Sequence, residues 1–357
     1  MSPLAALLRD IIAKDGPITV ERYMAEALGH PTHGYYVTRD PLGAKGDFTT
    51  APEISQMFGE MIGLWCVATW QRMGAPSPFL LAELGPGRGT LMADALRAAR
   101  LEPRFLDAAR LHLVETSPTL RDKQSAALSA HRPAWHDGIA TLPDGPLLLV
   151  ANEFFDALPI RQFERTADGW RERLIGCDAE RFVSVLSPHT PDEPLPHDAS
   201  VGAVVEISPV SLHIMGEIGK RIARNGGAAL AIDYGYVRAD NSRAWGETFQ
   251  ALRGHQRHDP LDAPGQADLT AHVDFAALAR AAREAGAVPQ GPLPQGLFLK
   301  ALGIDVRALR LARDATQEQR TAIDAALHRL THADGMGLLF KALAVAHPSL
   351  GAPDGFA

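Results

Sequence analysis

Short apolar segments alternate with helical patterns through most of the 357-residue chain. The helical patterns, in which apolar residues recur every three or four positions, are clearest at Ile54–Met73, Thr90–Arg100, Asp274–Ala285 and Asp305–Leu330. The apolar segments predict strands at Phe79–Leu84, Leu111–Val114, Ala134–His136, Leu147–Ala151, Gly227–Ile232 and Gly337–His347. Nearly continuous apolar strands between helices are typical of a parallel sheet that is covered on both faces. The pattern therefore predicts an α/β fold with a Rossmann-like sheet.

The first 75 residues are mostly helical in pattern and contain none of these strands. A stretch rich in glycine and proline, residues 74–78, separates them from the first predicted strand and marks a boundary. Two later stretches interrupt the alternation of strands and helices, and the second is too long and polar for a passive connection. We expect an N-terminal helical cap at 1–75 and a sheet domain at 76–357, with insertions at about 161–204 and 240–268.

The composition is that of an ordinary globular protein, with 46% hydrophobic and 22% charged residues. A formal net charge of -7 argues against a general affinity for nucleic acid or for anionic membranes, since both require a basic face. No apolar run is long enough to cross a bilayer. We expect no nucleic-acid partner, no membrane insertion, and a location in the cytoplasm or, after processing, inside an organelle.

No metal site is expected from the sequence. The two cysteines, Cys66 and Cys177, form neither a disulfide framework nor a paired zinc motif. His255 and His258 are close in sequence, but no third ligand is evident beside them.

The most informative stretch contains Gly85, Gly87 and Gly89, between a predicted strand and a predicted helix. Glycines at such a place permit a tight turn and the close approach of a ligand, and the helix N-terminus offers unpaired N–H groups. The turn could by itself be purely structural. The dinucleotide fingerprint has its third glycine where this chain has Thr90, and the carboxylate of Glu83 suits a pyrophosphate poorly. The cationic S-adenosyl-L-methionine is therefore favoured over NAD.

Acidic residues after the next two strands complete the expected cofactor site. Glu115 ends the second strand, where a carboxylate can accept hydrogen bonds from both ribose hydroxyls. Asp137 follows the short third strand and can meet an adenine amino group. The expected cofactor-binding residues from these strands are Glu83, Gly85, Pro86, Gly87, Gly89, Thr90, Glu115, Thr116, Asp137 and Asn152.

The strand Leu147–Ala151 leads directly into Asn152, Glu153 and Phe154. Ligands bind at this carboxyl edge in open α/β sheets. Amino-group methyltransferases often have two prolines after the first polar residue, where this chain has Glu153 and Phe154. Because guanidinium pairs bidentately with carboxylate, Glu153 and Asp156 are predicted to orient an arginine nitrogen. Alternatively, Asp156 caps a following helix and Glu153 contacts only the cofactor. Phe154 is expected to form a pocket wall.

Six stretches, in order along most of the chain, form a specific combination: Gly46–Glu53, Glu83–Gly89, Val114–Pro118, Asn152–Pro159, Ile232–Tyr236 and Asp268–Phe275. Together they resemble the MidA family of class I S-adenosylmethionine-dependent methyltransferases, also called DUF185. The resemblance implies a seven-stranded methyltransferase sheet with an added N-terminal helical part. It is weakest over Arg161–Ser200, and Phe249–Gly254 departs from the Asp–Thr–Leu–Arg–Gly run expected there.

Mitochondrial members of that family imply a protein substrate. They resemble protein arginine methyltransferases that modify a core subunit of respiratory complex I, the NADH:quinone oxidoreductase, and support its assembly. The resemblance thus implies arginine methylation of such a subunit, in the bacterial cytoplasm or, in a eukaryote, in the mitochondrial matrix.

The first of the six stretches is expected to fold over the cofactor. Asp47 would lie near charged groups and the hydroxyls of Thr49 and Thr50 would donate hydrogen bonds. The alternative is a structural turn in which Asp47 is a cap. Asp47 joins Asn152, Glu153 and Asp156 as the predicted catalytic set.

The last two stretches are expected to contribute to the substrate pocket. Asp233 and Tyr234 end the fifth strand, and His272 precedes a helix that Asp274 is expected to cap. With Phe154, these three residues, Asp233, Tyr234 and His272, form the predicted substrate-binding set. The alternatives are a buried polar pair at Asp233–Tyr234 and a surface or core histidine at His272.

The expected reaction is direct in-line transfer of the sulfonium methyl group to a nitrogen, for which the protein mainly supplies alignment. Three other functions stay open at this point. The protein could be an assembly factor that binds the cofactor without turnover, a methyltransferase of another nitrogen nucleophile, including one in nucleic acid, or a dehydrogenase. The sequence does not indicate the oligomeric state.

Overall fold

The computed structural model describes residues 2–38, 49–237, 246–254 and 256–356. The chain forms two compact units. The N-terminal unit combines Met1–Phe48, Asp156–Leu212 and Arg238–His272, and the sheet unit combines Thr49–Phe155, His213–Val237 and Val273–Ala357. This division differs from the expected boundary at residue 75. Both insertions belong with the N-terminal helices, whereas helix α5 (Gln56–Arg72) belongs with the sheet.

The sheet unit contains the seven-stranded path that the resemblance implied, in the order β15-β16-β10-β5-β2-β3-β4, with β14 paired beside β10 as an eighth strand. Strands β4, β3, β2, β5 and β10 are parallel, and β16 runs antiparallel to both β10 and β15. The strands are β2 Phe79–Leu84, β3 Ala109–Val114, β4 Ala134–His136, β5 Leu147–Asn152, β10 Gly227–Tyr236, β14 Val273–Asp274, β15 Val288–Pro294 and β16 Phe340–Ala346. The α/β class and the parallel centre of the sheet are thereby confirmed.

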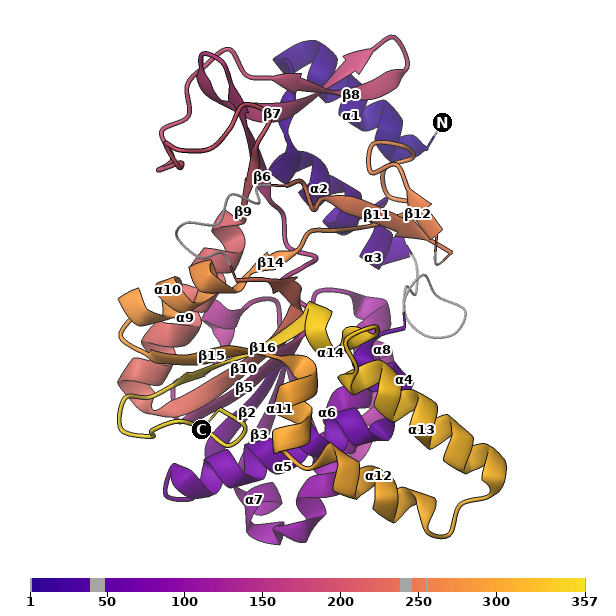
Figure 1. Ribbon diagram of the computed structural model, residues 1–357, viewed down its shortest axis with the longest axis vertical. Helices are drawn as coiled ribbons and strands as arrows, with labels where there is room; N and C mark the ends of the chain where they lie inside the picture. The colour runs from indigo at the N-terminus through magenta and orange to yellow at the C-terminus, as the bar shows by residue number, and fades with distance from the viewer. Residues whose placement is uncertain (1, 39–48, 238–245, 255, 357) are drawn as a thin grey trace. The chain divides into compact units, whose positions relative to one another are not determined.

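Helices cover both faces of this sheet, with α5 and α6 on one side and α9 and α10 on the other (Figure 1). Every residue of β2 and β5 is buried, which explains why their sequences are continuous apolar runs rather than alternating ones. Besides α5, the helices are α4 Ala51–Ile54, α6 Thr90–Ala98, α7 Pro103–Ala108, α8 Pro118–Ala127, α9 Pro209–Asn225, α10 Phe275–Glu284, α11 Gln295–Ala301, α12 Ile304–Ala312, α13 Gln317–Thr331 and α14 Met336–Leu339. Short 3-10 turns lie at Ala99–Leu101, Ser129–His131 and Ile139–Thr141.

The described part of the N-terminal unit contains two antiparallel sheets and three helices. One sheet has the order β1-β7-β6-β9 with β8 paired to β7, and the other has the order β12-β11-β13. Its elements are α1 Pro3–Asp15, β1 Ile18–Thr19, α2 Val20–Gly29, α3 Tyr35–Thr38, β6 Arg161–Thr166, β7 Gly169–Asp178, β8 Arg181–Leu186, β9 Val204–Ile207, β11 Gln250–Arg253, β12 Gln256–His258 and β13 Asp268–Thr270. Among the described residues, no helix is both long and apolar enough to span a bilayer.

The order of the strands determines where the sheet unit can bind a ligand. From β2 the chain proceeds to β3 and β4 on one side, then returns to β5 on the other side of β2. This reversal is a topological switch point, where the loops after neighbouring strands diverge and leave a crevice at the carboxyl edge. The glycine turn follows β2 and the Asn152–Glu153 pair ends β5, so both predicted motifs lie at that edge.

Candidate active site

The glycine turn after β2 has a backbone that only glycine adopts easily. Gly85, Gly87 and Gly89 have φ values of +58°, +54° and +82°, in the left-handed region that a Cβ atom disfavours. The Gly89 N–H donates to the Pro86 carbonyl at 2.8 Å and closes the turn. A Cβ atom added to Gly85 would lie 2.9 Å from Cδ2 of Phe154. The turn after β2 and the loop after β5 are therefore in direct contact.

Glu83 lies in β2, two residues before the turn. It is 3% exposed, and burial raises the pKa of its carboxyl group to about 8. Its Oε2 atom is buried and has no hydrogen-bond partner among the described residues. A buried acceptor without a partner costs free energy unless a ligand supplies a donor, so Glu83 is suited to receive a cation.

Glu115, directly after β3, is held by a network that the sequence analysis did not identify. Its Oε1 accepts the Ser117 N–H at 2.8 Å, and its Oε2 accepts from Nε2 of Gln124 at 3.3 Å. The same Gln124 nitrogen donates to the Gly87 carbonyl at 2.8 Å, and Oε1 of Gln124 accepts from Trp135 at 2.9 Å. Gln124 is fully buried in α8 and ties the glycine turn to the expected ribose-binding carboxylate.

Arg121, one helical turn before Gln124, is a second residue that the sequence analysis missed. Its Nε donates to the Glu115 carbonyl at 2.8 Å, and its Nη2 lies 2.6 Å from the Asp137 carboxylate. The Asp137 side chain is 85% exposed, so it lies at the rim of the candidate site. Thr116 is also exposed. The only sequence signal for the two contacts of Arg121 was a polar side chain one turn into the helix after β3.

Glu153 has an unusual backbone conformation at the end of β5. Its φ is +49°, which costs a residue with a Cβ atom about 1–2 kcal/mol. Its Oε1 accepts the Ala51 N–H at 2.8 Å and Nδ2 of Asn152 at 3.0 Å. Oδ1 of Asn152 is buried and has no hydrogen-bond partner among the described residues. Strained residues that the surroundings hold in place are concentrated at functional sites.

Asp233, near the end of β10, holds the backbone after β5. It is fully buried. Its Oδ2 accepts the N–H groups of Phe154 and Phe155 at 3.1 and 2.9 Å, and its Oδ1 accepts that of Tyr234 at 2.9 Å. These contacts hold the backbone at the start of the loop after β5, and the expected contact of Asp233 with a substrate stays a prediction. The Tyr234 ring packs against Phe340, with 5.6 Å between ring centroids.

The segment before α5 contacts the glycine turn. Oγ1 of Thr90, the first residue of α6, donates to Oε1 of Glu53 at 2.9 Å. Glu53 lies in α4, whose first residue, Ala51, donates to Glu153. Thr49 and Thr50 immediately precede α4 and are half-buried. Glu53 belongs to one of the six motif stretches, but the sequence did not single it out as a site residue.

Three predicted residues are not part of the described sheet unit. Asp47 lies outside the described residues. Asp156 and His272 belong to the N-terminal unit, where the Ala271 N–H donates to the Asp156 carbonyl and the His272 N–H donates to Oγ1 of Thr248. The alternative that Asp156 caps a helix is wrong, since the next regular element is strand β6. Asp274 does cap a helix, as expected, because its Oδ1 accepts the Ala276 and Ala277 N–H groups.

The residues of the sheet unit fit S-adenosyl-L-methionine. Two buried acceptor atoms without partners, Oε2 of Glu83 and Oδ1 of Asn152, occur on adjacent strands, where a ligand's ammonium group could donate to them. The Glu115 carboxylate lies beside the turn, where the hydroxyls of a ribose could donate to it. A bound ammonium group would favour the ionised form of Glu83, whereas that form would repel the pyrophosphate of a dinucleotide.

Comparison with known proteins agrees with this geometry. A family model described as "Putative S-adenosyl-L-methionine-dependent methyltransferase" matches residues 61–293. A crystal structure from Burkholderia thailandensis, a COG1565 superfamily member bound to S-adenosyl-homocysteine, has a TM-score of 0.89 and 31% identity, covering 99% of this chain and 94% of that one. S-adenosyl-homocysteine is what remains of the methyl donor after transfer.

Curated relatives extend the similarity to nearly the whole chain. The protein named "Protein arginine methyltransferase NDUFAF7, mitochondrial" of Danio rerio is 39% identical over 372 residues, or 96% of this chain and 86% of the relative. The protein of the same name from Homo sapiens is 40% identical over 349 residues, or 89% and 77%. With the glycine turn, the two unpartnered acceptors and the seven-stranded path, these matches show that the chain belongs to this family of S-adenosyl-L-methionine-dependent methyltransferases.

Proposed function

We propose that this protein methylates an arginine side chain of a protein substrate, and that Glu153 orients the guanidinium group. The observation that carries the proposal is the conformation of Glu153, a carboxylate held at φ +49° where β5 ends at the switch point of the sheet. A carboxylate pairs with the planar fork of a guanidinium through two parallel hydrogen bonds. A neutral amide substrate would not need this charge.

The chain's own residues would align the reacting nitrogen and receive its proton. When bound, S-adenosyl-L-methionine supplies a methyl group that is already activated by the sulfonium. Glu153 would hold the guanidinium with one nitrogen along the line of transfer, and alignment of this kind can be worth roughly 7–11 kcal/mol. The new bond joins nitrogen to the methyl carbon, the sulfur–methyl bond breaks, and the nitrogen loses one proton. Glu153 is the proposed acceptor of that proton.

The neighbours of Glu153 have supporting parts in this proposal. The Ala51 N–H and the Asn152 amide fix one of its carboxylate oxygens. Asn152 Oδ1 is left to accept from the cofactor or from the substrate guanidinium. Asp233 fixes the backbone of Phe154, which makes Phe154 a wall between the glycine turn and the substrate. Tyr234, half-buried at the end of β10, is the proposed wall on the opposite side.

The relatives support arginine as the target because their names describe protein arginine methyltransferases. The finer proposal is that the substrate is a core subunit of NADH:quinone oxidoreductase, which rests on the family resemblance alone. By the same resemblance the protein would act in the bacterial cytoplasm, or in the mitochondrial matrix of a eukaryote.

Replacing Glu153 by glutamine tests the catalytic proposal. The Glu153→Gln variant keeps an oxygen for the Ala51 N–H but loses the charge. We expect S-adenosyl-homocysteine to bind within about threefold of wild type, while methyl transfer falls at least a hundredfold. Glu284→Gln, an exposed change in α10, is the matched control and should leave both measurements unchanged. Normal methylation by Glu153→Gln would exclude the proposed role.

The substrate can be identified with lysate from a strain that lacks this protein. Incubation with purified enzyme and a labelled methyl donor, followed by mass spectrometry, should place the label on arginine. Glu153→Gln serves as the blank. Label on lysine, on glutamine or on nucleic acid would refute arginine specificity. Cofactor binding without any label would favour an assembly factor without turnover.

A further inference from the structure

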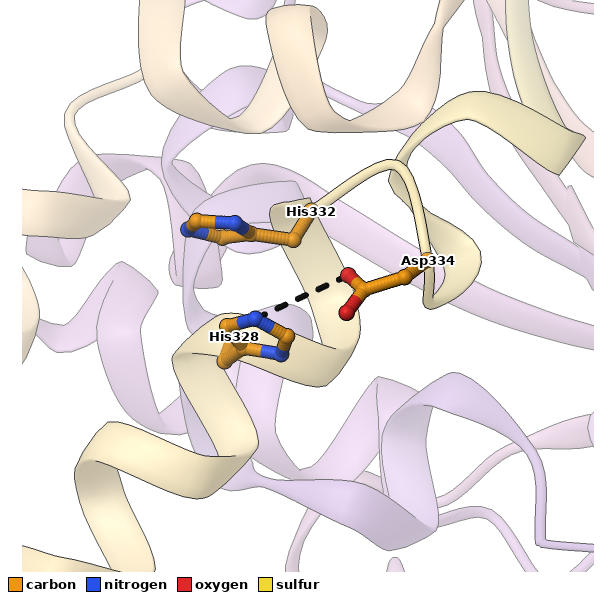
Figure 2. A group of neighbouring side chains, drawn as sticks. All are labelled: His328, His332 and Asp334. Atoms are coloured by element: carbon orange, nitrogen blue, oxygen red, sulfur yellow. Dashed lines mark ion pairs between the residues drawn. The ribbon is translucent and has the colours of Figure 1, made fainter.

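The end of α13 and the turn after it bring together three side chains that the proposed reaction does not use. His328, His332 and Asp334 each offer one ligand atom, and these atoms all lie within 4.8 Å of one another (Figure 2). Nε2 of His328 is 3.6 Å from Oδ1 of Asp334, and the two imidazole rings are stacked with 4.1 Å between centroids. All three side chains are exposed and accessible to an ion from solvent.

The backbone that carries these side chains is held in place. The His332 carbonyl accepts the N–H groups of Gly335 and Gly337 at 3.1 and 2.9 Å. A Cβ atom added to Gly337 would lie 2.1 Å from the Thr331 carbonyl oxygen, so the turn packs tightly against the end of α13. Gln295, fully buried in α11, donates to the Leu330 carbonyl at 2.9 Å. The ligand atoms therefore approach each other on a supported turn, which lowers the cost of arranging them around an ion.

We propose that His328, His332 and Asp334 bind one divalent first-row transition metal ion, and we take zinc as the test case. Imidazole nitrogen and carboxylate oxygen are both good zinc ligands, at about 2.0–2.2 Å from the ion. Tetrahedral ligands at that distance are about 3.4 Å apart, close to the observed separation of His328 Nε2 and Asp334 Oδ1. Two histidines four residues apart at the end of a helix lie on the same face.

Three protein ligands leave the fourth position of a tetrahedral ion for water or for a side chain of a partner. The alternative is that the cluster is only a stacked histidine pair with a surface ion pair. Such an exposed pair contributes little stability. The alternative also predicts no affinity for a metal, so a binding measurement separates the two.

The test uses full-length protein without a polyhistidine tag, titrated with zinc chloride by calorimetry. We expect one zinc per chain with a dissociation constant in the micromolar range, reversed by EDTA. The double variant His328→Ala/His332→Ala should bind at least tenfold more weakly, and Asp334→Asn should show a smaller loss. Cofactor binding should be unchanged in these variants, which shows that they are folded and keeps the test independent of the proposed reaction.

Two controls match the chemistry of the changes. Asp324→Asn removes an exposed carboxylate from the same helix, and His189→Ala removes an exposed histidine elsewhere. Both should bind zinc as wild type does. The proposal is overturned if the wild-type protein binds no zinc at a concentration 100-fold below millimolar, about 10 μM. It is also overturned if the double variant binds zinc as tightly as the wild type.

Discussion

The Ala51 N–H donates to the Glu153 carboxylate at 2.8 Å. This bond links the first residue of α4 to the residue directly after β5, 102 positions later in the sequence. It occurs beside a glutamate whose backbone is in the left-handed region. The protein thus accepts local strain and holds the strained carboxylate from two directions, which is the arrangement expected where geometry matters more than stability.

Comparing glycine with alanine at position 153 isolates this strain. Both variants lose the carboxylate and its hydrogen bonds, but only alanine keeps a Cβ atom at φ +49°. We expect Glu153→Gly to be more stable to unfolding than Glu153→Ala by about 1 kcal/mol. Denaturant titration measures the difference, and both variants should lack methyl transfer. Equal stabilities would mean that the backbone relaxes and that no strain is stored there.

The central strands and the glycine turn could be predicted because the signals are local. Strands buried on both faces give continuous apolar runs, and a turn between strand and helix requires glycines. The break between α12 and α13 could also have been predicted, because Thr316 and Gln319 form a capping box that begins α13. We did not use this signal and predicted helical structure over Asp305–Leu330.

The contacts that assemble the site could not be predicted, because they join residues far apart in sequence. Gln124 looks like any polar helix residue until the fold places it against the Gly87 carbonyl. No local pattern indicates that the Asp233 carboxylate accepts three backbone N–H groups. The membership of α5 in the sheet unit depends on packing against α6 and has no local signature.

Gln124 offers a test of how the turn is positioned. Replacing it by methionine keeps its volume but leaves the Gly87 carbonyl without this donor. We expect the Gln124→Met variant to lose about 1–3 kcal/mol of stability and to bind S-adenosyl-homocysteine at least tenfold more weakly. Gln295→Met is the matched control, because it also removes a fully buried donor to a carbonyl. It should lose similar stability but keep the cofactor affinity; equal losses of affinity would make the effect on binding non-specific.

The buried Glu83 should make cofactor binding depend on pH. Its pKa is raised to about 8 by burial, so the carboxyl group is mostly protonated at neutral pH. A bound ammonium group favours the ionised form, and binding then releases a proton. We expect the affinity for S-adenosyl-homocysteine to rise by up to about tenfold per pH unit between pH 6 and 8. Calorimetry in buffers of different ionisation heat measures the released proton.

The same group sets a pH dependence of stability with a definite sign. Between about 4.5 and about 8 the folded state keeps a proton that the unfolded state has released, so stability falls as pH rises through this range. Glu83→Gln should remove that slope together with the proton release on binding. A slope that persists unchanged in the variant would assign the effect to another group.

The contact between Gly85 and Phe154 predicts that the two loops of the site cannot be changed independently. In Gly85→Ala the new Cβ atom would lie 2.9 Å from Cδ2 of Phe154, at a φ of +58°. Gly74→Ala, at φ +86° with nothing within 4 Å, carries the backbone strain alone. We expect Gly74→Ala to cost about 1 kcal/mol with normal cofactor affinity, and Gly85→Ala to cost more and to lose binding. Adding Phe154→Leu to Gly85→Ala should recover part of the affinity, because a smaller side chain leaves space for the Cβ atom. If the second change recovers nothing, backbone strain rather than the crowding at Phe154 explains the loss.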